Sequence, residues 1–183
     1  MKYVEKHYGT GEGTGERILN PETVVFLDEG SSLEMDTVQI EGVDSTVRTT
    51  RATVGDRANL VIREKIMTHD QQYAKTDFSV EMNGEDSSVD LVSRSVAKGN
   101  SRQEFFSNIN GNNRCKGHSE CDAILMESGS VAAAPMLTAN HLDASLIHEA
   151  AIGKIAGDQI IKLMTLGLTE EEAEKQIITG FLK

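Results

Sequence analysis

The sequence predicts a mainly β fold that is followed by a short pair of C-terminal helices. Residues 23–152 consist of short segments in which apolar and polar residues alternate, separated by Gly, Asn, Asp and Ser, as is typical of strands and turns. A Gly followed by two apolar residues spaced by one recurs, with first apolar positions at Leu33, Leu60 and Val89. These positions lie 27 and 29 residues apart, a drifting period typical of a β-solenoid. An antiparallel β-sandwich also has short strands and frequent turns, so both architectures fit this pattern.

Residues 1–22 are predicted to form a flexible lead-in, because Gly alternates with Thr and Glu across residues 9–15. A phosphate-binding loop is the alternative for these glycines. It is disfavoured because the G-x-x-x-x-G-K-[ST] motif of ATPases is absent and no strand pattern precedes the segment. The β region that follows, residues 23–152, is expected to contain strands at Thr23–Leu27, Ser32–Ile40, Asn59–Ile66, Phe78–Met82 and Ser88–Val96.

The C-terminal segment, residues 153–183, is predicted to be a helix pair. Gly167 is placed to end the first helix, and Thr169 with Glu172 forms a capping box for the second. One explanation of this pair is a lid over the open end of the strand stack, and the pattern favours it. The other is a surface for docking a partner. The candidate docking residues are Ile160, Met164, Ala173, Ile177 and Phe181.

Composition limits the possible functions. The formal net charge is -11 and no long basic run occurs, which argues against a nucleic-acid-binding surface. No apolar run approaches the length of a membrane span, and the first residues show no signal-peptide pattern, so a cytoplasmic location is expected. Two cysteines do not make a disulfide framework, and in a reducing compartment they are better explained as ligands or reactive thiols.

The candidate chemistry lies late in the chain. Cys121 precedes His148 by 27 residues, about one coil of the suspected solenoid, and Glu149 follows directly. On adjacent coils, strands lie ~4.8 Å apart, so Cys121 and His148 could share a metal or a cluster. An imidazole nearby would also lower the pKa of the thiol. The plain alternative is that Cys121 is a small buried side chain and His148 a core or surface residue.

Two other sites are conceivable. Cys115, His118 and Cys121 lie at three-residue steps and could bind zinc, but a structural zinc site needs four ligands, so Cys115 and His118 are weak metal candidates. A Cys–His–acid hydrolase triad is disfavoured as well. Glu149 directly follows His148, and on a strand their side chains point to opposite faces.

The stretch from about Asn110 to Leu182 resembles the C-terminal core of the SufB/SufD family of iron–sulfur cluster assembly proteins. The similar segments are C-D-A-I-L at 121–125, A-x-L-x-H-E-A at 144–150 and I-x-x-D-Q-I at 155–160. The closing L-G-L-T-E-E-E-A-E-K-Q-I-I-T-G-F-L at 166–182 is the most specific. The resemblance implies a right-handed parallel β-helix for the β region, and therefore favours the solenoid. Family members are normally longer, so the chain is either a short member or a C-terminal fragment.

The resemblance also implies a function, that of a non-enzymatic scaffold holding a transient Fe–S cluster. Cys121 would be a thiolate ligand or sulfur acceptor, Glu149 an oxygen ligand or a group through which iron enters, and His148 a secondary ligand. The helix pair would dock the ABC-type ATPase of the Suf system, and a cysteine desulfurase would supply sulfur. The chain is expected to form a homodimer or a heterodimer with a paralogue. The alternative is a SufD-like subunit that docks the ATPase without building a cluster.

Overall fold

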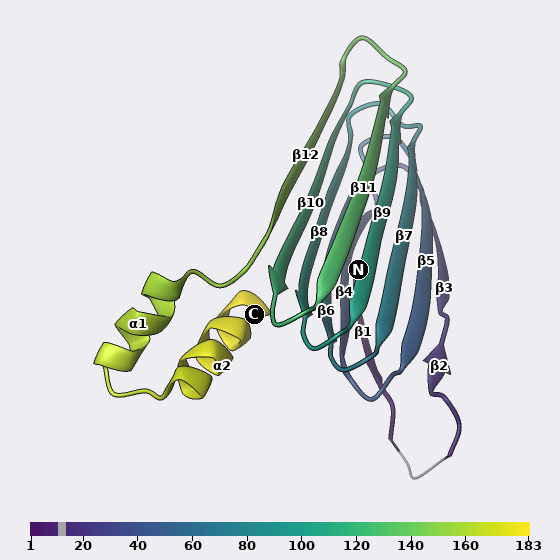
Figure 1. Cartoon of the computed structure of the whole chain (residues 1–183). Coiled ribbons are helices and arrows are strands. Elements are labelled where there is room, and N and C mark those ends of the chain that lie inside the picture. Colours follow the sequence, from purple (N-terminus) through teal and green to yellow (C-terminus); the bar gives the residue numbers. More distant parts are fainter. Residues whose placement is uncertain (11–13) are drawn as a thin grey trace.

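The computed structural model describes residues 1–10 and 14–183 as a parallel β-solenoid of about five turns followed by two helices (Figure 1). Each coil contributes one strand to each of two facing sheets. The elements are β1 (Lys2–Tyr8), β2 (Ile18–Leu19), β3 (Glu22–Leu27), β4 (Ser32–Glu41), β5 (Ser45–Val54), β6 (Asn59–Thr68), β7 (Tyr73–Met82), β8 (Ser87–Ala97), β9 (Arg102–Gly111), β10 (Cys115–Leu125), β11 (Ser130–Ala139), β12 (Ala144–Gly153), α1 (Gly157–Thr165) and α2 (Glu170–Phe181).

The strand pairing confirms the solenoid and excludes the sandwich, because all the described ladders are parallel. One sheet has the order β1-β4-β6-β8-β10-β12, and the other has β11-β9-β7-β5-β2 with β3 beside β5. The positions that repeat in the sequence lie opposite one another on neighbouring strands of the first sheet. Leu33 of β4 lies opposite Leu60 of β6, which lies opposite Val89 of β8.

The predicted flexible lead-in is wrong for residues 2–8. They form β1, which pairs with β4 and places Lys2 opposite Glu34. Lys2 Nζ lies 3.0 Å from the Glu34 carboxylate and 2.9 Å from that of Asp36. Of the glycine-rich stretch behind this prediction, residues 11–13 lie outside the described part of the chain. β1 therefore begins the solenoid instead of preceding it.

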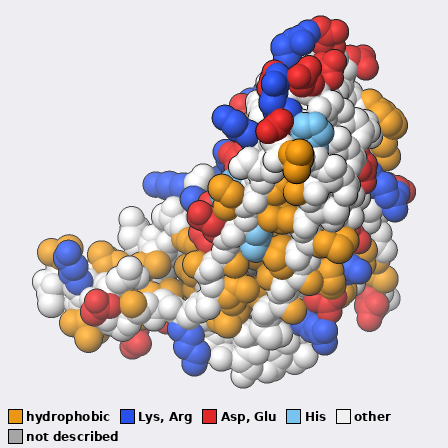
Figure 2. Space-filling view, turned by 90° about the horizontal axis from the view of Figure 1, so that it is seen from above, with side chains coloured by type: hydrophobic (Ala, Val, Ile, Leu, Met, Phe, Trp, Pro, Cys, Tyr) orange, Lys and Arg blue, Asp and Glu red, His pale blue; other side chains and the backbone are white. Residues whose placement is uncertain are grey.

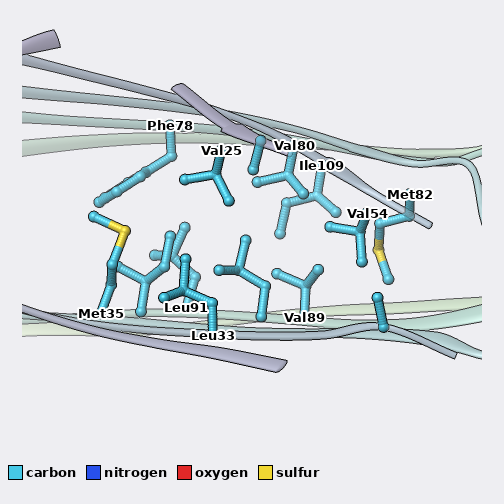
Figure 3. Packing of buried hydrophobic residues seen from close by; sticks show 14 of the residues in the cluster. Val25, Leu33, Met35, Val54, Phe78, Val80, Met82, Val89, Leu91 and Ile109 are labelled. Carbon is cyan, nitrogen blue, oxygen red and sulfur yellow. The ribbon is translucent and has the colours of Figure 1, made fainter. Parts of the chain in front are cut away.

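The interior of the solenoid has an apolar and a polar part. In the apolar part, Leu33, Met35, Val89 and Leu91 of one sheet face Val25, Val54, Phe78, Val80, Met82 and Ile109 of the other (Figure 3). In the polar part, most inward-facing side chains are hydroxyl-bearing or charged, and among them are Arg48, Glu64, Thr76, Ser93, Ser107 and Ser119. Burial of the apolar side chains is the main source of stability.

Stacked turns require glycine where successive coils come closest. A Cβ atom on Gly84 would lie only 1.9 Å from the carbonyl carbon of Gly55 in the preceding coil. Coil-to-coil backbone contact therefore explains why glycine occupies these two positions.

The helix pair does not cover the open end of the solenoid, so the lid interpretation is wrong. α2 lies beside the carboxyl ends of the neighbouring strands β4, β6, β8 and β10 of the first sheet, where it shares a groove with Ile40, Met67 and Met126. α1 extends away from the strands (Figure 1). The predicted capping box of Thr169 and Glu172 is present. Gly167 has a φ of 97°, the left-handed conformation expected after a helix end.

Candidate functional site

The candidate residues lie on β10 and β12, the last two strands of the first sheet. β12 is the edge strand, and β10 lies between it and β8. Because side chains on a strand alternate between faces, Ser119 and Cys121 face the solenoid interior, whereas His118 and Glu120 face outward. The site therefore has an inner and an outer half on the two faces of one strand.

Cys121 belongs to the inner half and is only 1% exposed. Its register neighbours are Ser93 on β8 and Ala150 on β12. Burial, with the negative charges of Glu64 and Asp122, raises the pKa of the Cys121 thiol to about 12. The expectation of a lowered pKa is therefore wrong for the chain in this conformation, because desolvation and nearby carboxylates both disfavour the thiolate.

His148 also faces the interior, but it lies opposite Ser119 and not opposite Cys121. The coil from β10 to β12 is 29 residues long, so the residue opposite Cys121 is Ala150, two positions beyond His148. Cys121 and His148 are therefore diagonal neighbours on adjacent strands. Both ring nitrogens of His148 are buried without a hydrogen-bond partner among the described residues, and burial lowers the pKa of the imidazole.

Cys115 and His118 do not join Cys121 in one site. Cys115 also faces the interior, but six residues along a strand span about 20 Å, so its thiol lies far from that of Cys121. His118 faces outward. The suggested zinc cluster of Cys115, His118 and Cys121 is therefore wrong, because a three-residue step on a strand places neighbouring candidates on opposite faces.

Glu149 belongs to the outer half of the site. It lies opposite Glu120 of β10, and the ligand atoms of Glu149, Glu120 and His118 all lie within 4.8 Å of one another. His118 Nδ1 is 2.8 Å from the carboxylate of Asp90 on β8. The prediction that Glu149 acts beside Cys121 and His148 is wrong within one chain, since Glu149 is on the other face of the sheet.

Glu120 was not among the candidates from the sequence. A signal for it exists, because Glu120 precedes Glu149 by 29 residues, the length of the coil from β10 to β12, and follows His118 by two. Burial raises the pKa of the Glu120 carboxyl, and a hydrogen bond with Asp122 raises it further.

A buried charged group lies next to the inner half. Glu64 accepts hydrogen bonds from Thr76 at 3.0 Å and Ser93 at 2.8 Å, and its Oε1 is 3.6 Å from Arg48 Nε. Burial raises the pKa of Glu64, opposed by the positive charge of Arg48. Ser93 is thus both the register neighbour of Cys121 and a donor to Glu64, so the thiol adjoins a hydrogen-bonded polar network.

A hydrolase triad has no support in this geometry. Glu149 and His148 point to opposite faces of β12, as the sequence predicts, so Glu149 cannot orient the imidazole. Since the His148 nitrogens have no partner among the described residues, no other described carboxylate orients it either.

The five candidate docking residues differ in exposure. Ala173 is fully buried, so its role in docking is wrong for this conformation. Met164 is 43% exposed, and the other three are half-buried. The more exposed apolar side chains of α1 and its C-terminal cap are Ile161 at 63% and Leu166 at 76%. Figure 2 shows hydrophobic side chains on the surface of the helical extension as well as on the solenoid.

The fold and the site define a parallel β-solenoid protein with a buried thiol near its last coil and an imidazole that has no partner among the described residues. Comparison with known protein families identifies the chain further. The family described as SUF system FeS cluster assembly, SufBD core domain, matches residues 2–181. The chain therefore belongs to the SufBD family.

Individual relatives agree with this assignment. A SufBD family protein of Archaeoglobus fulgidus is 30% identical over 90% of this chain and 45% of its own length. A SufBD family protein of Methanocaldococcus jannaschii is 28% identical over the whole of this chain and 58% of its own length. The chain thus spans about half the length of these two relatives. Among the described residues, no helix has the length and apolar character needed to cross a membrane.

Proposed function

We propose that this chain is a scaffold subunit on which an iron–sulfur cluster is assembled in the cytoplasm, without enzymatic activity of its own. Family membership supports the assembly role, and the observation that carries the scaffold role is the inner pair of Cys121 and His148. A thiol and an imidazole are the side chains that ligate iron–sulfur clusters. The two free nitrogens of His148 give it ligand atoms that no described protein group occupies.

One chain alone supplies too few ligands for a cluster. Clusters are usually held by four protein ligands, and the inner half provides Cys121 and His148, with Cys115 too distant to contribute. We therefore infer that a second chain, either another copy or a paralogue, completes the site at the open end of the solenoid. The edge strands β11 and β12 present unpaired backbone groups there, and exposed apolar side chains such as Met136 and Ile147 lie on them.

Assembly in this scaffold requires the last coil to move. Cys121 is buried and its thiol is protonated at neutral pH, so it must become accessible before it accepts sulfur from a cysteine desulfurase. The ABC-type ATPase of the system would supply this rearrangement by docking on the helix pair. Within that pair, Ile161, Met164 and Leu166 offer the exposed apolar contacts.

The alternative function is a SufD-like subunit that docks the ATPase but builds no cluster. The burial of Cys121 favours this alternative, because a cysteine that only fills space in the core would also be buried.

Isolation under anaerobic conditions separates the two functions. The chain would be produced together with the Suf partners of its host, and iron and acid-labile sulfide would be measured in the wild type, in Cys121→Ser and in the matched control Cys115→Ser. The scaffold predicts that iron and sulfide are lost in Cys121→Ser and kept in Cys115→Ser. Equal iron and sulfide in all three proteins, or none in any, would favour the inert subunit.

A further inference from the structure

The outer half of the site contains an arrangement that the proposed cluster site does not use. His118 and Glu120 on β10 and Glu149 on β12 bring one imidazole and two carboxylates together, with their ligand atoms within 4.8 Å of one another. Glu120 and Glu149 are register partners, so two like charges face each other across ~4.8 Å. Directly opposed like charges destabilise a sheet unless something positive lies between them.

The ring of His118 is oriented by a carboxylate, as is usual for metal-binding histidines. Its Nδ1 lies 2.8 Å from Asp90 Oδ1, which leaves Nε2 as the nitrogen available to a ligand. Metal-ligating histidines almost always give their other nitrogen to a carboxylate or carbonyl, which fixes the ring orientation. Asp90 is in turn fixed by Arg63, whose Nη2 is 2.5 Å from Asp90 Oδ2. The charge of Asp90 is therefore already balanced, and the two glutamates supply the net negative charge.

The surroundings leave room for a cation and its water ligands. His118 and Glu120 line a groove of about 550 Å³ on the outer face of the sheet, together with Asp90 and the basic residues Arg63, Lys65, Arg94 and Lys183. Of these basic residues, Arg63 is paired with Asp90, and Arg94 lies opposite Asp122 on β10. Lys65 donates its ammonium group to the backbone oxygen of Lys183. The formal net charge of -11 also attracts cations to the surface.

We propose that His118, Glu120 and Glu149 form a binding site for a divalent transition metal, separate from the thiol on the inner face of β10. One imidazole and two carboxylates suit Fe²⁺, Mn²⁺ or Zn²⁺ and leave coordination positions open for water or exchange. Asp90 is a positioning residue that acts through His118. That the natural metal is ferrous iron destined for cluster assembly is an inference that rests on the proposed function. The binding of a divalent metal does not.

Manganese provides a test that is independent of sulfur chemistry. Free Mn²⁺ has an electron paramagnetic resonance signal that is lost on binding, so titration of the purified chain in metal-free buffer gives stoichiometry and affinity. We expect one Mn²⁺ per chain, with an affinity about 10–100-fold weaker in His118→Ala, Glu149→Gln and Asp90→Asn. The matched controls are His141→Ala, which removes an exposed histidine near Asp143, and Glu171→Gln on α2. Both should bind as the wild type does.

The outcomes distinguish this site from the cluster scaffold. Absence of Mn²⁺ binding in the wild type, or equal weakening by the control and site variants, would overturn the metal site. Cys121→Ser should leave Mn²⁺ binding unchanged, because the thiol lies on the other face of the strand. If Cys121→Ser abolishes binding, the separate outer site is wrong. If Mn²⁺ binds as described while anaerobic isolation yields no cluster, the metal site stands and the scaffold function fails.

Discussion

Glu120 and Cys121 are neighbours in β10, yet Glu120 faces outward beside Glu149 and Cys121 is buried inside the solenoid. One strand therefore presents carboxylate and imidazole ligands on one face and a thiol on the other. Metal and sulfur chemistry can be held apart by the thickness of a single sheet, and the last coil must open if they are to meet at Cys121.

The raised pKa of Cys121 predicts a pH-dependent contribution to stability. The folded-state pKa of about 12 exceeds the ordinary value of 9.0, so the contribution is fully present below pH 9.0 and is lost as the pH rises towards 12. Cys121→Ala has no group that titrates there. Between about pH 8 and pH 11, the free energy of unfolding of the wild type should fall by on the order of 1–3 kcal/mol more than that of Cys121→Ala.

Urea denaturation at several pH values measures this difference. A parallel pH dependence for the two proteins would mean that the thiol is solvated in the folded state. The control is Cys115→Ala, which removes the other buried thiol and leaves Cys121 in place.

The buried pair of Arg48 and Glu64 predicts strong coupling between the two side chains. Arg48→Met would leave the Glu64 carboxyl buried without its cation and should destabilise the protein by about 3–5 kcal/mol. Thr76 and Ser93 donate to different oxygens of Glu64, so Glu64→Gln alone keeps an acceptor for only one of them and leaves the Arg48 charge less compensated. The double variant should cost less than the sum of the single ones by at least about 1 kcal/mol. Additive costs in a denaturation series would show that the pair does not interact.

The stacked turns predict opposite effects for two Gly→Ala substitutions. Gly84→Ala places a methyl group against the backbone of Gly55 and should destabilise the solenoid by more than about 1 kcal/mol. Gly180→Ala lies in α2, where nothing surrounds the added methyl, and it should stabilise the helix by about 0.4–1 kcal/mol. Thermal unfolding of both variants checks this pair. Equal effects would contradict the close approach of the two coils.

The sequence predicts the solenoid well where the inner face is apolar. Leu33, Leu60 and Val89 were aligned by spacing alone, and they are register partners. β5 and β9 were not singled out, because several of their inward positions carry Thr, Arg, Gln or Ser and show little apolar alternation. β1 was missed because this mostly exposed strand is defined by its pairing with β4, which is distant in sequence.

The site was predicted less well, for a geometric reason. The coil length drifts by two residues, so His148 aligns with Ser119 instead of Cys121. A drift of two preserves the face of a side chain, which is why Cys121 and His148 still both point inward. Residue types identified the candidates. Only the alternation of side chains between the two faces of a strand shows that Glu149 and His118 lie on the face opposite the thiol.

The central claim, that Cys121 ligates a nascent cluster, is tested most directly by anaerobic reconstitution with ferrous iron and sulfide. Visible absorption would be recorded for the wild type, Cys121→Ser and Cys115→Ser. The account predicts sulfur-to-iron charge-transfer absorption in the wild type and in Cys115→Ser, and its loss in Cys121→Ser. Absorption that survives in Cys121→Ser but disappears in Cys115→Ser would place the cluster in the apolar end of the solenoid and contradict the account.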